Sequence, residues 1–163
     1  MSEDPIKDAL NLMPYGFYCI TSTDGDDFNA MVANWVSQVS FDPRLVALAL
    51  QKKSYTHTVI QKGKVLAINL FLKKDSELIK PFSKSRNKNP AKMENADYTL
   101  SPETSCPIIT GAAAYLECKC IDIVDIQGDH DLVIGEIVGA GIMKSGEAQD
   151  ILTLPDLGWN YAG

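Results

Sequence analysis

The chain lacks the features that would assign it to a membrane, secreted or nucleic-acid-binding class. No stretch approaches the roughly 20 unbroken apolar residues of a membrane-spanning helix, so we expect no membrane contact. The first residues, Met-Ser-Glu-Asp-Pro, are acidic and include no apolar core, so we expect no secretory signal and a cytoplasmic location. The net charge is −6, and the basic stretch 80–92 is broken by two prolines. We interpret that stretch as a solvated loop or helix end and expect no nucleic-acid partner.

Motifs of several common enzyme classes are also missing. No Gly-x-Gly-x-x-Gly opens a helix after a strand, and the sequence has no Walker loop, no Gly-x-Ser-x-Gly elbow and no zinc-protease helix. Cys118 and Cys120 form a Cys-x-Cys pair, but no second pair lies at metal-ligand spacing, and His57 and His130 are distant in sequence. We therefore expect no metal site and interpret the four cysteines as reduced thiols.

The pattern of apolar residues predicts a mainly β protein. With 163 residues, the chain is long enough for one domain with a real core, so we expect a single domain over residues 1–163. Six or so strands with few helices between them favour an antiparallel barrel over a parallel doubly wound sheet. The expected strands are 15–23, 28–35, 45–50, 64–71, 113–126 and 131–143, and the expected helices are 5–13, 54–62 and 76–84.

Three further expectations concern irregular parts of the chain. Leu116, Cys118 and Cys120 alternate inward, and then Ile121 and Ile123 take the opposite parity, which predicts a β-bulge near Cys120. The long polar segment 85–110 is typical of a loop that covers a site. The tail 151–163, which holds Trp159 and Tyr161, is expected to be exposed or to contact a partner.

The most informative stretch is 31–57. Small and hydrogen-bonding residues lie between two strand-like runs, and a basic pair with a Ser-x-Thr step then opens a helix. Short side chains between strands let a planar ring approach the backbone, while Ser54 and Thr56 offer hydroxyls, helix-start N–H groups and nearby positive charge to a phosphate. An ordinary strand end followed by a capped surface helix is an equally good reading of the residues alone.

The same stretch closely resembles the flavin reductase-like family, the FMN-binding split barrels. Members carry an Ala-Asn-x-x-x-Gln-x-Ser-x-x-Pro strand–loop–strand segment and then a Ser-x-Thr-His helix start, and both patterns are present here, from Ala33 and from Ser54. The resemblance covers roughly residues 12 to 145. This sequence differs from the family pattern at Val32 and Asp131, where members often have Thr, and at Arg44, where members often have a second proline.

The resemblance implies a split β-barrel of Greek-key type with an FMN site. The flavin ring would lie along Ala33, Asn34, Trp35, Val36, Ser37, Gln38 and Ser40. The phosphate would be held by Lys53, Ser54 and Thr56. His130, in a Gly-Asp-His turn, would face the nicotinamide or stabilise the reduced ring, although a hairpin turn with a satisfied histidine is the alternative. Phe82 and Ser85 match a Phe-x-x-Ser loop that closes over the flavin, although the residues alone slightly favour a helix end.

The resemblance also implies a function. The chain would be an FMN-binding oxidoreductase that takes electrons from NAD(P)H and passes them through flavin to an acceptor, such as free flavin, ferric iron or a redox protein. A second subunit would complete the site, so a homodimer is implied. Two alternatives stay open, namely an FMN electron carrier without a nicotinamide site and a binding module without redox activity. Val32 is the residue that favours the last.

Overall fold

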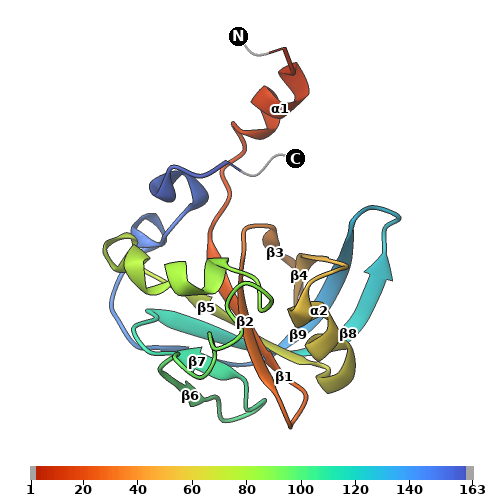
Figure 1. The fold of residues 1–163 in the computed structure, drawn as a ribbon, viewed down its shortest axis with the longest axis vertical. Helices are drawn as coiled ribbons and strands as arrows, with labels where there is room; N and C mark the ends of the chain where they lie inside the picture. Colours follow the sequence, from red (N-terminus) through yellow and green to blue (C-terminus); the bar gives the residue numbers. More distant parts are fainter. Residues whose placement is uncertain (1–2, 161–163) are drawn as a thin grey trace.

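The computed structural model describes residues 3–160 and has a seven-stranded antiparallel sheet that curls into a barrel (Figure 1). The strand order is β2-β1-β5-β8-β9-β4-β3. The strands are β1 (Tyr18–Thr23), β2 (Phe28–Ala33), β3 (Val36–Phe41), β4 (Arg44–Gln51), β5 (Val65–Leu70), β8 (Ala114–Asp125) and β9 (His130–Ile142). The predicted mainly β fold with an antiparallel barrel is confirmed.

The split lies between the two edge strands, β2 and β3. They follow each other in the chain, yet they stand at opposite ends of the strand order, so no hydrogen-bonded ladder joins them. Asn34 and Trp35 alone link the end of β2 to the start of β3, and the carbonyl of Trp35 accepts a hydrogen bond from Ala49 N–H at 3.0 Å. The chain thus crosses from one edge of the sheet to the other at this point.

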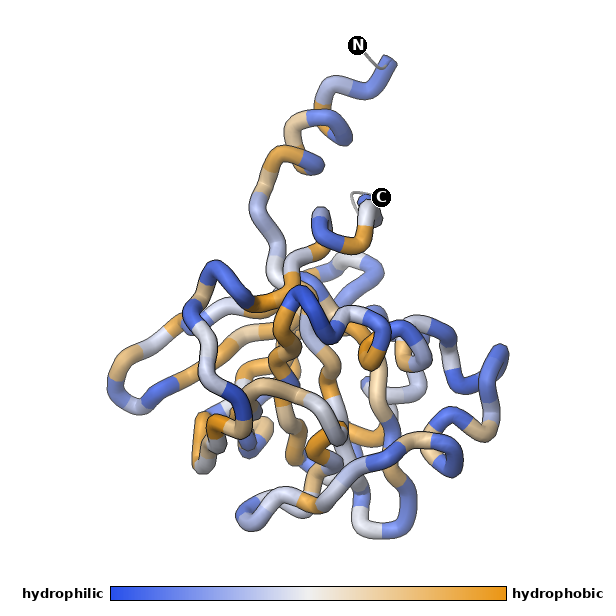
Figure 2. Tube along the Cα trace, turned by 90° about the vertical axis from the view of Figure 1, so that its left-hand side faces the viewer, coloured by the Kyte–Doolittle hydropathy of each residue, from blue (hydrophilic) through white to orange (hydrophobic). Residues whose placement is uncertain are grey.

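Two apolar cores lie on opposite sides of the curled sheet. Ile20, Leu48, Leu66 and Ile68 are buried inside the barrel. The second core, on the other side, is built of buried side chains that include Phe17, Phe71, Ile79, Phe82, Leu152 and Leu154. Figure 2 shows the hydrophobic segments gathered along the strands in the body of the molecule and the hydrophilic ones in the loops.

The long strands β8 and β9 are bent by irregular pairing. Their register shifts between Glu117 and Cys118 and again between Cys120 and Asp122, so the predicted bulge near Cys120 is confirmed. Ile123 packs against the barrel core as expected. The inward position predicted for Ile121 is wrong, because 53% of this residue is exposed. The extra residue of the bulge changes which side chains face inward.

The helices are few and short. α1 (Pro5–Leu10), capped by the Asp4 carboxylate, projects from the body (Figure 1). α2 (Tyr55–Gly63) begins after the Ser54 cap and ends at Lys64, which has a left-handed backbone. The predicted helix 76–84 is wrong. The chain instead forms two 3-10 helices, η1 (Lys73–Leu78) and η2 (Lys80–Ser83), because Pro81 has no N–H to continue an α-helix.

Two other irregular segments differ from expectation. Within 85–110, β6 (Tyr98–Leu100) and β7 (Pro107–Ile109) form a small two-stranded sheet. The tail carries η3 (Ala148–Asp150) and η4 (Leu154–Leu157). The prediction of an exposed tail is wrong for Leu152 and Leu154, which are buried. Contact of the tail with a partner stays a prediction, and Tyr161 lies outside the described residues. Within residues 3–160, no helix is both long and apolar enough to cross a bilayer.

Candidate functional site

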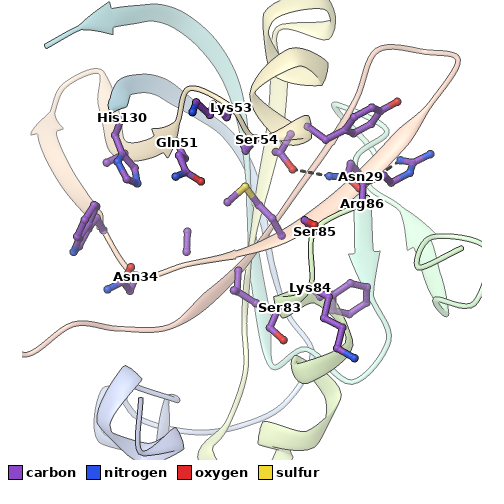
Figure 3. Close-up of a pocket in the computed structure, with 18 of the residues that line it drawn as sticks. Asn29, Asn34, Gln51, Lys53, Ser54, Ser83, Lys84, Ser85, Arg86 and His130 are labelled. Atoms are coloured by element: carbon purple, nitrogen blue, oxygen red, sulfur yellow. Dashed lines mark hydrogen bonds between the residues drawn. The ribbon is translucent and has the colours of Figure 1, made fainter. Parts of the chain in front are cut away.

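A cavity of about 570 Å³ opens beside the crossing from β2 to β3. Its walls come from β2 and the crossing, the end of β4, the first turn of α2, the segment 82–87 and the C-terminal tail. A volume of several hundred Å³ is in the range of small-molecule and cofactor sites. Figure 3 shows side chains from these separate segments facing one another across this space.

One end of the cavity is rich in donors for an anion. Ser54 caps α2, and its Oγ accepts a hydrogen bond from His57 N–H at 3.2 Å. The buried Thr56 hydroxyl lies two residues further along the chain and accepts a hydrogen bond from Asn29 Nδ2 at 2.8 Å. Lys53 lines the same end. The N-terminus of α2 adds its partial positive charge, so this end suits a phosphate.

Arg86 joins the anion end from the segment 82–87, as Figure 3 shows. Its guanidinium donates to Phe28 O at 2.8 Å and to Asp27 Oδ1 at 3.1 Å, and it lies 4.6 Å from the centroid of the Tyr55 ring. The Tyr55 hydroxyl also donates to Asp27. Burial raises the pKa of Asp27, but these hydrogen bonds outweigh burial and hold the pKa below its usual range. Arg86 is therefore fixed in position as a planar cation at the cavity wall.

A second cation, which lies shortly after the segment 82–87, is buried. Lys92 lines the cavity with only 4% of its surface exposed, and its Nζ donates to Lys84 O at 3.0 Å. Burial and the like charge of Arg86 lower the pKa of Lys92. The interpretation of 80–92 as a solvated loop or helix end is therefore wrong for Lys92, which is buried in the cavity wall. Arg86 is only partly exposed, whereas Lys84, which also lines the cavity, is exposed as expected.

The other end of the cavity offers flat and polar surfaces. The rings of Trp35 and His130 lie 4.9 Å apart between centroids, and His130 Nδ1 lies 2.7 Å from Asp129 Oδ1. Asn34 is only 8% exposed, and its Nδ2 has no hydrogen-bond partner among the described residues. A buried donor without a partner is costly, so a ligand acceptor at this position would stabilise the site.

A buried pair lies behind this wall. His57 Nε2 is 2.7 Å from Asp131 Oδ2, and Lys52 Nζ lies 3.8 Å from Asp131 Oδ1. His57 directly follows Thr56, and Asp131 directly follows His130. The pair thus connects the helix turn of the anion end with the strand that carries His130.

The cavity brings together nine of the predicted site residues: Ala33, Asn34, Trp35, Lys53, Ser54, Thr56, Phe82, Ser85 and His130. Four others do not line it: Val36, Ser37, Gln38 and Ser40. These four lie on β3, where Ser37 and Gln38 are exposed and Gln38 Nε2 bonds Ser40 O at 3.2 Å. Their contact with a flavin stays a prediction.

Sequence reasoning missed several residues of the wall, including Asn29, Met31, Gln51, Arg86 and Lys92. Asn29 and Met31 lie on β2 directly before the recognised motif, so extending that motif upstream along the strand would have found them. Arg86 and Lys92 carried a weaker signal, which was their place at the start of a long polar segment expected to cover a site.

The chain is similar to known proteins. A model of the family described as "Flavin reductase like domain" matches residues 10–157. The chain is 34% identical over 141 residues to the high molecular weight rubredoxin of Moorella thermoacetica, covering 85% of this chain and 61% of that protein. It is 28% identical over 151 residues to the ferric-chelate reductase (NAD(P)H) of Archaeoglobus fulgidus, covering 91% of this chain and 86% of that protein.

Solved structures agree on the fold. The NADH:FAD oxidoreductase of Streptomyces globisporus superposes with a TM-score of 0.76 at 24% identity, covering 88% of this chain and 82% of that one. The chain spans less than two thirds of some relatives, including about a quarter of a putative diflavin flavoprotein of Nostoc. The match over residues 10–157 nevertheless includes the barrel and almost all of the cavity wall. The chain therefore belongs to the flavin reductase-like domain family.

Proposed function

We propose that the chain is an FMN-dependent oxidoreductase that takes electrons from NAD(P)H and passes them to a small or protein acceptor. The observation that carries the proposal is the cavity itself. It joins an anion-binding end, built by Ser54, Thr56 and Arg86, to an end with flat rings and the unpartnered Asn34 amide. A flat ring system with polar edges and a phosphate tail matches both ends, and membership of the family supports a flavin as that ligand.

Bound FMN would accept a hydride from NAD(P)H, which leaves NAD(P)⁺, and would later release the two electrons to the acceptor. The protein's part is to bind and orient. Ser54, Thr56 and Arg86 would hold the phosphate, with Lys53 adding charge. Asn34 Nδ2 would donate to an acceptor on the ring edge. His130 would stand beside the ring with Nδ1 held by Asp129, which leaves Nε2 for a ligand.

The second part of the proposal concerns assembly and location. We propose a homodimer in which a second copy covers β3, where Phe41 is 90% exposed and Val39 is also exposed. Ser37, Gln38 and Ser40 would then meet the flavin at the subunit boundary, while Val36 would pack beside it. A symmetric pair is the commonest oligomer. The cytoplasm is the proposed location, since it would keep the four free cysteines reduced.

The acceptor has two candidates from different classes. The names of relatives include a ferric-chelate reductase and an NADPH-flavin oxidoreductase, which favour a small acceptor. Another relative is named as a rubredoxin, which favours an electron carrier that passes electrons to or from a redox protein. In the second case no nicotinamide site would be needed.

The visible spectrum of the purified protein is the test. We expect a flavin spectrum after incubation with FMN and desalting, and bleaching of the flavin band when NADH or NADPH is added without oxygen. Bleaching by dithionite but by neither nicotinamide would favour the carrier. A protein that stays colourless at saturating FMN would overturn the proposal. Sedimentation of the same sample measures the dimer.

A further inference from the structure

The C-terminal tail is built onto the body by a short series of backbone hydrogen bonds. Leu152 N–H donates to Phe71 O at 2.8 Å, and Phe17 N–H donates to Leu152 O at 3.2 Å. Leu154 N–H then donates to Tyr15 O at 3.1 Å. With Leu152 and Leu154 buried, the tail is fixed to the second core beside the cavity.

The next residues turn the tail back toward the cavity. Asp156 Oδ2 accepts hydrogen bonds from Thr153 N–H at 2.8 Å and from Thr153 Oγ1 at 2.7 Å, which fixes the start of η4. Gly158 ends this helix with a φ of 67°, a left-handed conformation that glycine adopts without strain. The chain then reverses direction, so Trp159 and Asn160 line the cavity.

Trp159 presents a large apolar surface there. Its ring packs edge-on against Phe17, with centroids 5.6 Å apart and an interplanar angle of 82°. The buried side chains of Phe82 and Leu154 line the same cavity. Trp159 itself remains 38% exposed. A tryptophan ring held at a cavity wall with exposed surface gains free energy when a flat ring covers it.

The wall that Trp159 and Asn160 form comes from the very end of the described chain. The family match ends at residue 157, whereas Trp159 and Asn160 lie beyond it. The flavin-ring and phosphate contacts proposed above come from within the matched residues. Trp159 therefore adds a wall to the cavity beside the residues proposed to hold the flavin.

We propose that Trp159 forms the wall of a second-ligand subsite that takes the nicotinamide ring of the electron donor. The inference rests on the proposed function and deepens it. A planar ring matches the Trp159 face, and Asn160 offers amide groups beside it. An oxidised nicotinamide carries positive charge, so it also gains from the electron-rich face of an indole. Lys84, at the same cavity, suits the phosphates of a dinucleotide.

The test uses the FMN-loaded protein, with NAD⁺ and NADP⁺ as probes that bind without reducing the flavin. Isothermal titration should give a dissociation constant about 3- to 10-fold higher for Trp159→Ala than for the wild type, as expected for an aromatic contact. Trp159→Phe should restore most of the affinity. Gln149→Ala, an exposed change in the same tail, is the control and should bind the probes normally. The affinity for FMN should be equal in all four proteins.

A second readout is independent of titration heat. Addition of the probe should quench the tryptophan fluorescence of the wild type more than that of Trp159→Phe. Equal probe affinity and equal quenching would overturn the inference. So would a parallel loss of FMN affinity in Trp159→Ala, because Trp159 would then serve the flavin, or a change only in the monomer–dimer ratio, because a second copy would then cover the ring.

The failure of the inference differs from the failure of the proposed function. If the wild type binds a probe and Trp159→Ala binds it equally well, only the role of Trp159 is lost. If the wild type binds FMN but neither probe at millimolar concentration, both the subsite and the nicotinamide donor are lost. If it does not bind FMN, the proposed function itself is wrong.

Discussion

His57 Nε2 lies 2.7 Å from Asp131 Oδ2, and these two side chains are only 8% and 12% exposed. Breaking a buried pair leaves one polar partner unsatisfied, which costs about 3–5 kcal/mol when that partner is charged. We expect Asp131→Asn to lower the free energy of unfolding by about 3 kcal/mol in urea titrations. Asp125→Asn removes an exposed partner of Lys52 and should cost less than about 1 kcal/mol. Equal costs for the two variants would contradict the prediction.

Arg86 should matter for the phosphate of FMN more than for its ring. A charge-assisted hydrogen bond contributes about 1.5–3 kcal/mol, so Arg86→Met should weaken FMN binding about 10- to 100-fold. Riboflavin has no phosphate and should bind both proteins alike. Arg86→Lys should recover part of the affinity, because it keeps the charge but not the planar fork. Lys88→Met is the control, since Lys88 does not line the cavity. An equal loss of riboflavin affinity in Arg86→Met would show that Arg86 only holds the segment 82–87 in place and does not contact the phosphate.

The pH dependence of stability should report on Asp27. Its pKa is below the ordinary 3.8, because the bonds from Tyr55 and Arg86 outweigh burial. Such a carboxylate stabilises the fold above its unfolded pKa, and this stabilisation is lost as the pH falls through the lower, folded pKa. We expect Asp27→Asn to lower the free energy of unfolding at pH 7, and this deficit should shrink as the pH is lowered through the folded pKa of Asp27, which lies below 3.8. Asp26→Asn, on the exposed neighbour, should change little at either pH. A deficit that stays constant with pH would refute the assignment.

The cysteines should differ in reactivity. Burial raises the pKa of Cys19 and of Cys118 to about 12 and that of Cys106 to about 11, so these thiols are protonated and shielded at pH 8. Cys120 is only partly buried. Native protein should therefore react with Ellman's reagent first at a single thiol, and all four should react in urea. Cys120→Ser should remove the fast phase. A fast phase that survives this change would place the reactive thiol elsewhere.

A side chain at position 63 should destabilise the fold. A Cβ there would lie 1.9 Å from the carbonyl oxygen of Thr23, a backbone atom that cannot move aside without shifting β1 from α2. Gly63→Ala should cost about 1–3 kcal/mol of stability, as overpacking does. Gly128→Ala is the matched control, because the nearest atom to its Cβ would be 4.0 Å away. Thermal melts of both variants measure the difference. If Gly63→Ala melts at the same temperature as the control, the contact between the new Cβ and the carbonyl oxygen of Thr23 must be relieved by a small shift of the backbone.

Local pattern predicted much of the barrel from the sequence. Strands with buried, apolar runs, such as β4 and β5, were found because their side chains carry the signal themselves. β3 was missed as a strand, because most of its residues are exposed and show no alternation. In the site, Ser54 was found through a helix cap that spans four residues. Arg86 was not, because its role depends on Asp27, which is 59 residues away in sequence.

The two-residue crossing at Asn34 and Trp35 sets the width of the opening. Three Cα–Cα steps separate Ala33 from Val36 and span at most about 11 Å. The end of β2 and the start of β3 therefore stay within that distance of each other. The width of the ligand that the cavity admits then depends on the length of this link as well as on the side chains of the wall. Inserting one residue into this link would lengthen its reach by about 3.5 Å and would also move Asn34 and Trp35, which line the cavity, so a change in link length alters both the spacing of the two strands and the wall itself.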